Sequence, residues 1–142
     1  MEVSREPVVT GVLETALYVA DVPRAETFYQ SLFGFPKLEG DDRFTALEVP
    51  GRQVLLLFKQ GASTQPIPLP FGVIPPHDGA GQLHFALSIP ATELTPWVEC
   101  LRARGIAIES RVTWPRGGTS LYFRDPDGNL VELATPGLWW RP

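Results

Sequence analysis

Three titratable side chains stand where each could take part in chemistry. Glu132 lies between Val131 and Leu133 in an otherwise apolar stretch. A carboxylate at such a position is costly to bury, unless solvent, a cation or a metal ion offsets the cost. Glu14 and His84 supply a second carboxylate and an imidazole, groups that transfer protons and bind metal ions in proteins. These residues are the first candidates for a functional site.

An internal repeat gives Glu14 and His84 equivalent positions. Residues 11–19 (GVLETALYV) align with residues 81–89 (GQLHFALSI), with a glycine, an alanine and two leucines in common. Successive side chains of a strand point to opposite faces, so both residues are expected on the face turned away from the apolar positions. A carboxylate and an imidazole, each followed on that face by a small side chain, predict a concave and accessible surface.

The repeat continues into the elements that must position these residues. Helices are expected from Pro23 to Phe33 and from about Thr92 to Arg104, with Asp21 and Thr92 as N-caps and a glycine after each helix. Three short strands are expected after each helix, near residues 36–39, 44–49 and 53–59 in the first half and near residues 107–113, 120–124 and 130–134 in the second. Each half is therefore predicted to run strand, helix, strand, strand, strand.

This pattern predicts an α+β fold, built of two βαβββ modules within a single domain at residues 1–142. A chain of 142 residues is long enough to fold without disulfides. Module 1 is expected at about residues 11–59 and module 2 at about residues 81–136. The proline- and glycine-rich segment 60–80 between them is expected to be a linker or an ordered loop, not a strand. The apolar tail at residues 137–142 is expected to pack on the fold or on a second subunit.

The composition excludes several classes of function. The net charge is −4 and no basic run of five residues occurs, so neither nucleic acid nor an anionic membrane surface is an expected partner. The apolar stretches are far shorter than the ~20 residues that span a bilayer. Residues 1–10 look like a loose leader without the apolar segment of a secretory signal. A single cysteine, Cys100, favours a cytoplasmic location, where disulfides are rare.

Simpler interpretations of the polar residues stay open at this point. Glu132 could pair with an arginine such as Arg124 or Arg111. His77 is expected to be a loop residue that could border a cavity. The aspartates of the Asp-Pro-Asp-Gly sequence at residues 125–128 are expected to form a turn instead of a metal site.

Five further residues are candidates to line a pocket for a flat or apolar ligand. They are Tyr18, Leu56, Phe58, Trp114 and Tyr122. Leu56 is also the residue that the repeat aligns with Glu132. Aromatic side chains in a small domain are more often part of the core, so this prediction competes with a purely structural role.

Two stretches resemble the vicinal oxygen chelate superfamily, which includes glyoxalase I, bleomycin-resistance proteins and extradiol dioxygenases. The first is ETALYVAD at residues 14–21, followed by a helix that contains Phe-Tyr and ends at Gly-Phe. The second consists of LHFAL at residues 83–87 and YFRDPDGNLVEL at residues 122–133. The DPDGN turn before a glutamate with apolar neighbours is the most specific part of this resemblance, which extends over roughly residues 12–136.

The resemblance implies curled strands that close a cup around one divalent metal ion, with the helices on the outer face. By position it assigns Glu14, His84 and Glu132 as the metal ligands, with either glutamate as a possible catalytic base. The ion would be Fe, Mn, Zn, Ni or Mg, and it would chelate adjacent oxygens of a small-molecule substrate. Lyase, isomerase or dioxygenase chemistry and a homodimer are implied in the same way.

Two departures from the family pattern bear on the reaction. Glu14 stands where many members have histidine, which lowers the charge of the site and disfavours the dianionic catecholate of a ring-cleaving dioxygenase. Leu56 stands where glyoxalase I has a fourth protein ligand. The alternative function is a metal-free binding protein, similar to bleomycin-resistance proteins, that sequesters a small molecule.

Overall fold

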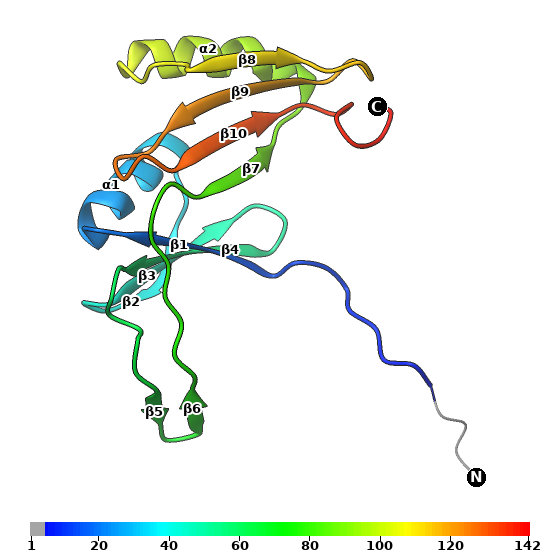
Figure 1. The fold of residues 1–142 in the computed structure, drawn as a ribbon. Helices are drawn as coiled ribbons and strands as arrows, with labels where there is room; N and C mark the ends of the chain where they lie inside the picture. The colour runs from blue at the N-terminus through cyan, green and yellow to red at the C-terminus, as the bar shows by residue number, and fades with distance from the viewer. Residues whose placement is uncertain (1–4) are drawn as a thin grey trace.

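The computed structural model describes residues 5–142 and contains two four-stranded sheets, one from each half of the chain (Figure 1). The elements of the first half are β1 (Glu14–Val19), α1 (Val22–Phe33), β2 (Lys37–Gly40), β3 (Phe44–Val49) and β4 (Gln53–Lys59). Those of the second half are β7 (His84–Ser88), a 3₁₀ turn (Ala91–Glu93), α2 (Leu94–Ala103), β8 (Ser110–Thr113), β9 (Thr119–Arg124) and β10 (Leu130–Ala134). The predicted α+β class with two βαβββ modules is confirmed.

The two sheets have the same topology, which confirms the internal repeat. The strand orders are β1-β4-β3-β2 and β7-β10-β9-β8. In each sheet the first strand runs parallel to the last strand of its module, and the remaining pairs are antiparallel. The sheets are not hydrogen-bonded to one another, so the fold has no closed barrel.

Helix α1 has the ends that the sequence predicts. The Asp21 side chain accepts a hydrogen bond of 3.0 Å from the backbone N–H of Arg24, which satisfies a donor of the first turn. At the other end Gly34 adopts a left-handed conformation with φ of 70° and donates its N–H to the carbonyl of Gln30. A residue with a side chain would be strained there, so glycine ends the helix.

Helix α2 begins later than expected. Residues Ala91–Glu93 form a 3₁₀ turn, closed by a hydrogen bond from Glu93 N–H to the carbonyl of Pro90, and α2 starts at Leu94. Thr92 lies inside this turn and is not the N-cap. The expected N-cap was therefore wrong, because the turn that follows Pro90 uses the residues that would otherwise open the helix.

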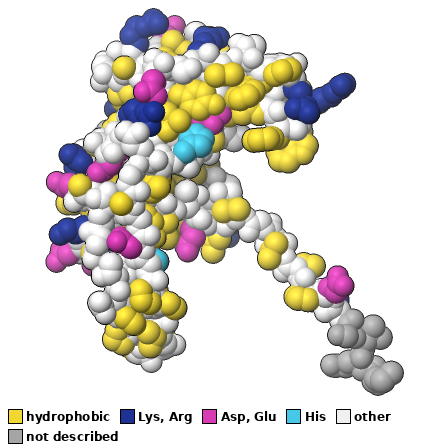
Figure 2. Space-filling model, viewed as in Figure 1, with side chains coloured by type: hydrophobic (Ala, Val, Ile, Leu, Met, Phe, Trp, Pro, Cys, Tyr) yellow, Lys and Arg dark blue, Asp and Glu magenta, His cyan; other side chains and the backbone are white. Residues whose placement is uncertain are grey.

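The linker contains a β-hairpin, which corrects the expectation that it holds no strand. Strands β5 (Ile67–Leu69) and β6 (Gly72–Ile74) pair antiparallel and project from the body of the molecule (Figure 1). A two-stranded hairpin leaves each strand with a free edge, and Pro68 is tolerated on such an edge. Hydrophobic side chains cover this hairpin (Figure 2), and Phe71 at its tip is 86% exposed.

One core unites the two modules, because α1 packs against both sheets. It lies on β3 and β4 of its own module. Its aromatic residues reach the second module, with ring centroids 6.1 Å apart for Tyr29 and Phe85 and 5.2 Å apart for Phe33 and Trp97. Each sheet thus buries the face that carries the helices and leaves its other face open. Among the described residues, no helix is long and apolar enough to cross a membrane.

Candidate functional site

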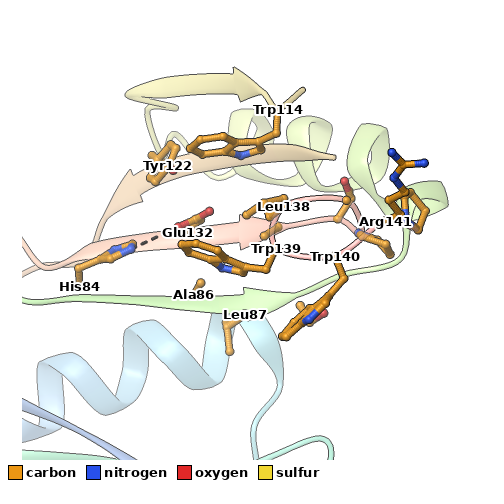
Figure 3. Close-up of a pocket in the computed structure, with 16 residues that line it drawn as sticks. His84, Ala86, Leu87, Trp114, Tyr122, Glu132, Leu138, Trp139, Trp140 and Arg141 are labelled. Carbon is orange, nitrogen blue, oxygen red and sulfur yellow. Dashed lines mark ion pairs between the residues drawn. The ribbon is translucent and has the colours of Figure 1, made fainter. Parts of the chain in front are cut away.

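The open face of the second sheet brings two of the predicted site residues together. His84 opens β7, and Glu132 lies in the middle of the neighbouring parallel strand β10. The imidazole Nε2 is 3.2 Å from the Glu132 carboxylate Oε1 (Figure 3). The alternation of side chains along both strands places them on this face, opposite the helices.

The backbone fixes the tautomer of His84. Its Nδ1 lies 2.9 Å from the carbonyl oxygen of Leu130. A carbonyl oxygen only accepts hydrogen bonds, so Nδ1 must carry the proton. In the neutral imidazole, Nε2 therefore presents a lone pair toward Glu132.

The second oxygen of Glu132 is also engaged. Ser120 on β9 donates its hydroxyl to Oε2, and the Ser120 oxygen accepts a 2.8 Å hydrogen bond from the indole N–H of Trp114. The Glu132 side chain is only 8% exposed. The carboxylate is thus held at one oxygen and directed at His84 with the other.

The sequence left a pairing of Glu132 with an arginine open, and the structure gives Arg124 another partner. Arg124 makes a 2.9 Å ion pair with Glu109 and donates to the carbonyl of Gly128. Within residues 5–142, His84 is the only basic side chain that forms an ion-pair contact with Glu132. A buried carboxylate is thereby left without a permanent positive charge beside it.

Tyr122 borders the pair. It lies directly opposite Glu132 in the register of β9 and β10, and its ring centroid is 6.3 Å from that of His84. Partial burial raises the pKa of the Tyr122 phenol, the neighbouring Ser120 hydroxyl partly opposes this effect, and the Glu132 carboxylate raises the pKa further. The phenol therefore stays protonated at neutral pH and can donate a hydrogen bond.

These groups lie in a pocket of about 690 Å³ over the second sheet (Figure 3). Trp114 and Tyr122 form part of the wall, and the C-terminal segment that follows β10 closes one side. The segment is attached through its backbone, because Gly118 N–H donates to the carbonyl of Gly137. Trp139 and Trp140 also line the pocket, yet they are 79% and 80% exposed.

Glu14, the third predicted ligand, lies on the other sheet. It is exposed at the start of β1, where it pairs in register with Val54 of β4. Among the residues that the structure describes, no three His, Cys, Asp or Glu side chains are close enough to hold a metal ion. A single chain therefore assembles His84 and Glu132 but does not add Glu14.

The remaining predicted pocket residues also belong to the first sheet. Tyr18, Leu56 and Phe58 lie on its open face and do not line the 690 Å³ pocket. The linker covers part of this face, because the His77 Nδ1 is 2.8 Å from the Tyr18 hydroxyl and the His77 ring packs on Phe58. One neighbour of the Glu132–His84 pair, Ser120, was not predicted, whereas Trp139 belongs to the apolar tail that was expected to pack on the fold or on a second subunit. Ser120 carries no distinctive sequence signal.

Comparison with known proteins agrees with this fold. The family model of the Glyoxalase/Bleomycin resistance protein/Dioxygenase superfamily matches residues 11–133. The chain therefore belongs to the glyoxalase/bleomycin resistance protein/dioxygenase superfamily, which confirms the resemblance seen in the sequence.

Individual relatives differ in their described activities. A solved structure of lactoylglutathione lyase from Agrobacterium tumefaciens is 35% identical, with a TM-score of 0.83 over 92% of this chain and 97% of the other. A catechol-2,3-dioxygenase of Bacillus subtilis is 31% identical over 121 residues. That match covers 82% of this chain but only 38% of the dioxygenase. A virulence protein of Salmonella typhimurium is 29% identical over 92% of this chain and 88% of its own length.

Proposed function

We propose that this protein is a metal-dependent enzyme that chelates adjacent oxygens of a small organic substrate. The divalent ion would be held by His84 and Glu132 of one chain together with Glu14 of a second copy. The observation that carries the proposal is the 3.2 Å approach of His84 Nε2 to Glu132 Oε1.

When the imidazole is neutral, two hydrogen-bond acceptors, Nε2 of His84 and Oε1 of Glu132, face each other at 3.2 Å. The Leu130 carbonyl holds the proton of the imidazole on Nδ1, and Ser120 engages the far oxygen of Glu132. A lone pair and a carboxylate oxygen repel one another unless a proton or a cation lies with them. An imidazole nitrogen and a carboxylate oxygen are ligands that Fe, Mn, Zn, Ni and, less often, Mg accept. The donor set therefore fits a divalent ion.

A second copy of the chain is the natural source of the third ligand. Glu14 occupies the position on β1 that His84 occupies on β7, and its carboxylate is exposed. The open face of the first sheet in one copy could then cover the pocket on the second sheet of another. Two carboxylates and one neutral imidazole balance the charge of a dication, which supports a homodimer with shared sites.

Different residues around the ion would act as general base, as hydrogen-bond donor and as apolar wall. When bound, the metal acts as a Lewis acid and polarises the substrate oxygens. Glu14 or Glu132 would remove a proton as the general base, and the protonated Tyr122 phenol would donate a hydrogen bond to a substrate oxygen. Trp114 and Leu138 form an apolar wall that excludes water from the reacting atoms.

Within this class, lyase or isomerase chemistry is favoured over ring cleavage. Glu14 adds a negative charge where extradiol dioxygenases typically use a neutral histidine. The likeness to a lactoylglutathione lyase over nearly the whole chain supports the same choice. The single cysteine further supports a place in the cytoplasm.

Metal analysis tests the proposal, and the chain offers a matched control. It has two histidines, of which His84 lies in the site and His77 packs against the first sheet. Protein purified without a metal-affinity tag should contain close to one divalent ion per chain. His84→Ala should lose that metal and His77→Ala should keep it. Wild-type protein that neither contains nor takes up a divalent ion would contradict the proposal.

A screen of small substrates would then identify the reaction. Diols, 2-oxoaldehyde–thiol adducts and 2-hydroxy ketones all present adjacent oxygens to an ion. Turnover of one class that disappears in His84→Ala assigns the activity.

A second candidate function is the sequestration of a flat apolar molecule. The exposed indoles of Trp139 and Trp140 beside the pocket favour it, because aromatic ligands stack on such surfaces. Metal-free protein whose tryptophan fluorescence is quenched by aromatic compounds would support this function over the enzymatic one.

A further inference from the structure

We infer that Ser120 and Trp114 form a directional hydrogen-bond relay that positions Glu132 as a metal ligand through one oxygen. This inference rests on the proposed function, since it concerns the same metal position. Ser120 and Trp114 would not touch the ion or the substrate oxygens in these roles. They are positioning residues.

The chemistry of the three groups allows only one direction for the relay. The indole N–H of Trp114 can donate but cannot accept, so the Ser120 oxygen accepts from it over 2.8 Å. The Ser120 hydroxyl hydrogen is then free to point at Oε2 of Glu132, which accepts as a carboxylate. Each bond in the relay therefore orients the next.

Backbone geometry holds both positioning residues in place. Ser120 is paired in register with Ala134 on β10, so it is a diagonal neighbour of Glu132 on the same face. Trp114 begins a tight turn in which its N–H donates to the Gly118 carbonyl and its own carbonyl accepts from Gly117. Ser120 is fully buried, so no water competes with these hydrogen bonds.

The relay leaves Glu132 with one free oxygen. Because Oε2 accepts from Ser120, only Oε1 is turned toward His84 and the metal position. Binding of the ion through both oxygens would make Oε2 share its lone pairs between the ion and the Ser120 hydroxyl, so binding through Oε1 alone is favoured. Without the hydroxyl, the carboxylate could rotate about its last side-chain bond, and its buried Oε2 would lack a donor.

Two variants test the two links of the relay separately. Ser120→Ala removes the hydroxyl with almost no change in volume, and Trp114→Phe keeps an aromatic ring but removes the N–H. Ser88→Ala is the control, because Ser88 lines the same pocket without a hydrogen bond to Glu132. The probe is Co²⁺ added to metal-free protein, with its dissociation constant measured by titration and its ligand field by visible absorption.

The expected result is a graded loss of metal affinity. Ser120→Ala should bind Co²⁺ about 10 to 100 times more weakly, the range for groups that orient metal ligands. Its Co²⁺ absorption bands should differ from those of the wild type, which a loss of overall stability alone would not produce. Trp114→Phe should shift both measurements in the same direction by less, and Ser88→Ala should match the wild type.

Other outcomes separate the relay from the proposed function. Wild-type affinity and spectrum in Ser120→Ala would overturn the relay while leaving the metal site intact. If Ser120→Ala does not fold, Trp114→Phe carries the test, and wild-type behaviour there overturns the relay. Failure of the wild-type protein to bind Co²⁺ would overturn the proposed function and the relay together.

Discussion

The Tyr29 hydroxyl donates a 2.8 Å hydrogen bond to the carboxylate of Asp125 and thereby ties the helix of the first module to a turn of the second. Both residues are buried. Asp125 also accepts from the backbone N–H groups of Asp127 and Asn129, which closes the Asp-Pro-Asp-Gly-Asn turn before β10. The position of β10, and with it of Glu132, is therefore linked to α1.

Removal of this hydrogen bond should destabilise the protein. Tyr29→Phe leaves a buried carboxylate oxygen with one donor fewer, and hydrogen bonds to charged groups contribute about 1.5–3 kcal/mol. We expect a loss of that size in the free energy of unfolding, measured by urea denaturation. Tyr122→Phe on the open face should cost less, and an equal loss in the two variants would contradict the special role of Tyr29.

The same residue should make stability depend on pH in the alkaline range. Burial raises the pKa of the Tyr29 phenol above its ordinary value, and the charge of Asp125 raises it further. The unfolded chain ionises this phenol near pH 10 whereas the folded chain does not, so stability is full below that pH and falls as the pH rises above it.

Comparison with Tyr29→Phe isolates this effect from other alkaline titrations. The stability difference between the wild type and Tyr29→Phe should shrink by about 1.4 kcal/mol per pH unit above pH 10. Urea denaturation at pH 8, 10 and 11 measures it. A difference that stays constant over this range would show that the phenol ionises equally in both states.

A shared metal site predicts complementation between two defective chains. Glu14→Ala and His84→Ala should each lose the metal when purified alone. In a mixed dimer, the His84→Ala chain supplies Glu14 and the other chain supplies His84 and Glu132, which restores one of the two sites. Co-expressed chains with two different tags, purified through both, should contain about one ion per dimer. Metal-free mixed dimers would exclude a site shared in this way.

The absence of a side chain at Gly118 should be required for the C-terminal segment to pack beside the pocket. A methyl group there would lie 2.7 Å from the carbonyl carbon of Gly137 and 2.8 Å from the carbonyl oxygen of Pro136. Because both contacts are with backbone, Gly118→Ala should push the C-terminal segment off the sheet. Carboxypeptidase digestion should then remove Trp139 and Trp140 faster than in the wild type. Thr113→Ala, at an exposed position, serves as the control and should leave the digestion rate unchanged.

Local signals in the sequence were sufficient for most of the secondary structure. The bounds of β3, β4 and β10 match the predicted ranges, because each is an apolar stretch between turn residues. The N-cap at Asp21 and the glycine after α1 likewise act within one helical turn. The period of two residues along a strand was also enough to place His84 on the face turned away from the apolar positions, which is the open face of the second sheet.

Other features depend on contacts between residues far apart in the chain. The hairpin in the linker forms through pairing of β5 with β6, which outweighs the proline content of the segment. The relay from Trp114 to Glu132 joins two strands and a turn. A serine at position 120 does not by itself indicate in the sequence that it makes these two hydrogen bonds.

Glu14 is the clearest case of a position that sequence patterns could not settle. The repeat correctly makes it the counterpart of His84, because the two modules share one topology. Among the residues that the structure describes, Glu14 nevertheless does not join His84 and Glu132 in a group of three ligands. How two sheets sit on a common core depends on the fit of many buried side chains, and local periodicity carries no information about that fit.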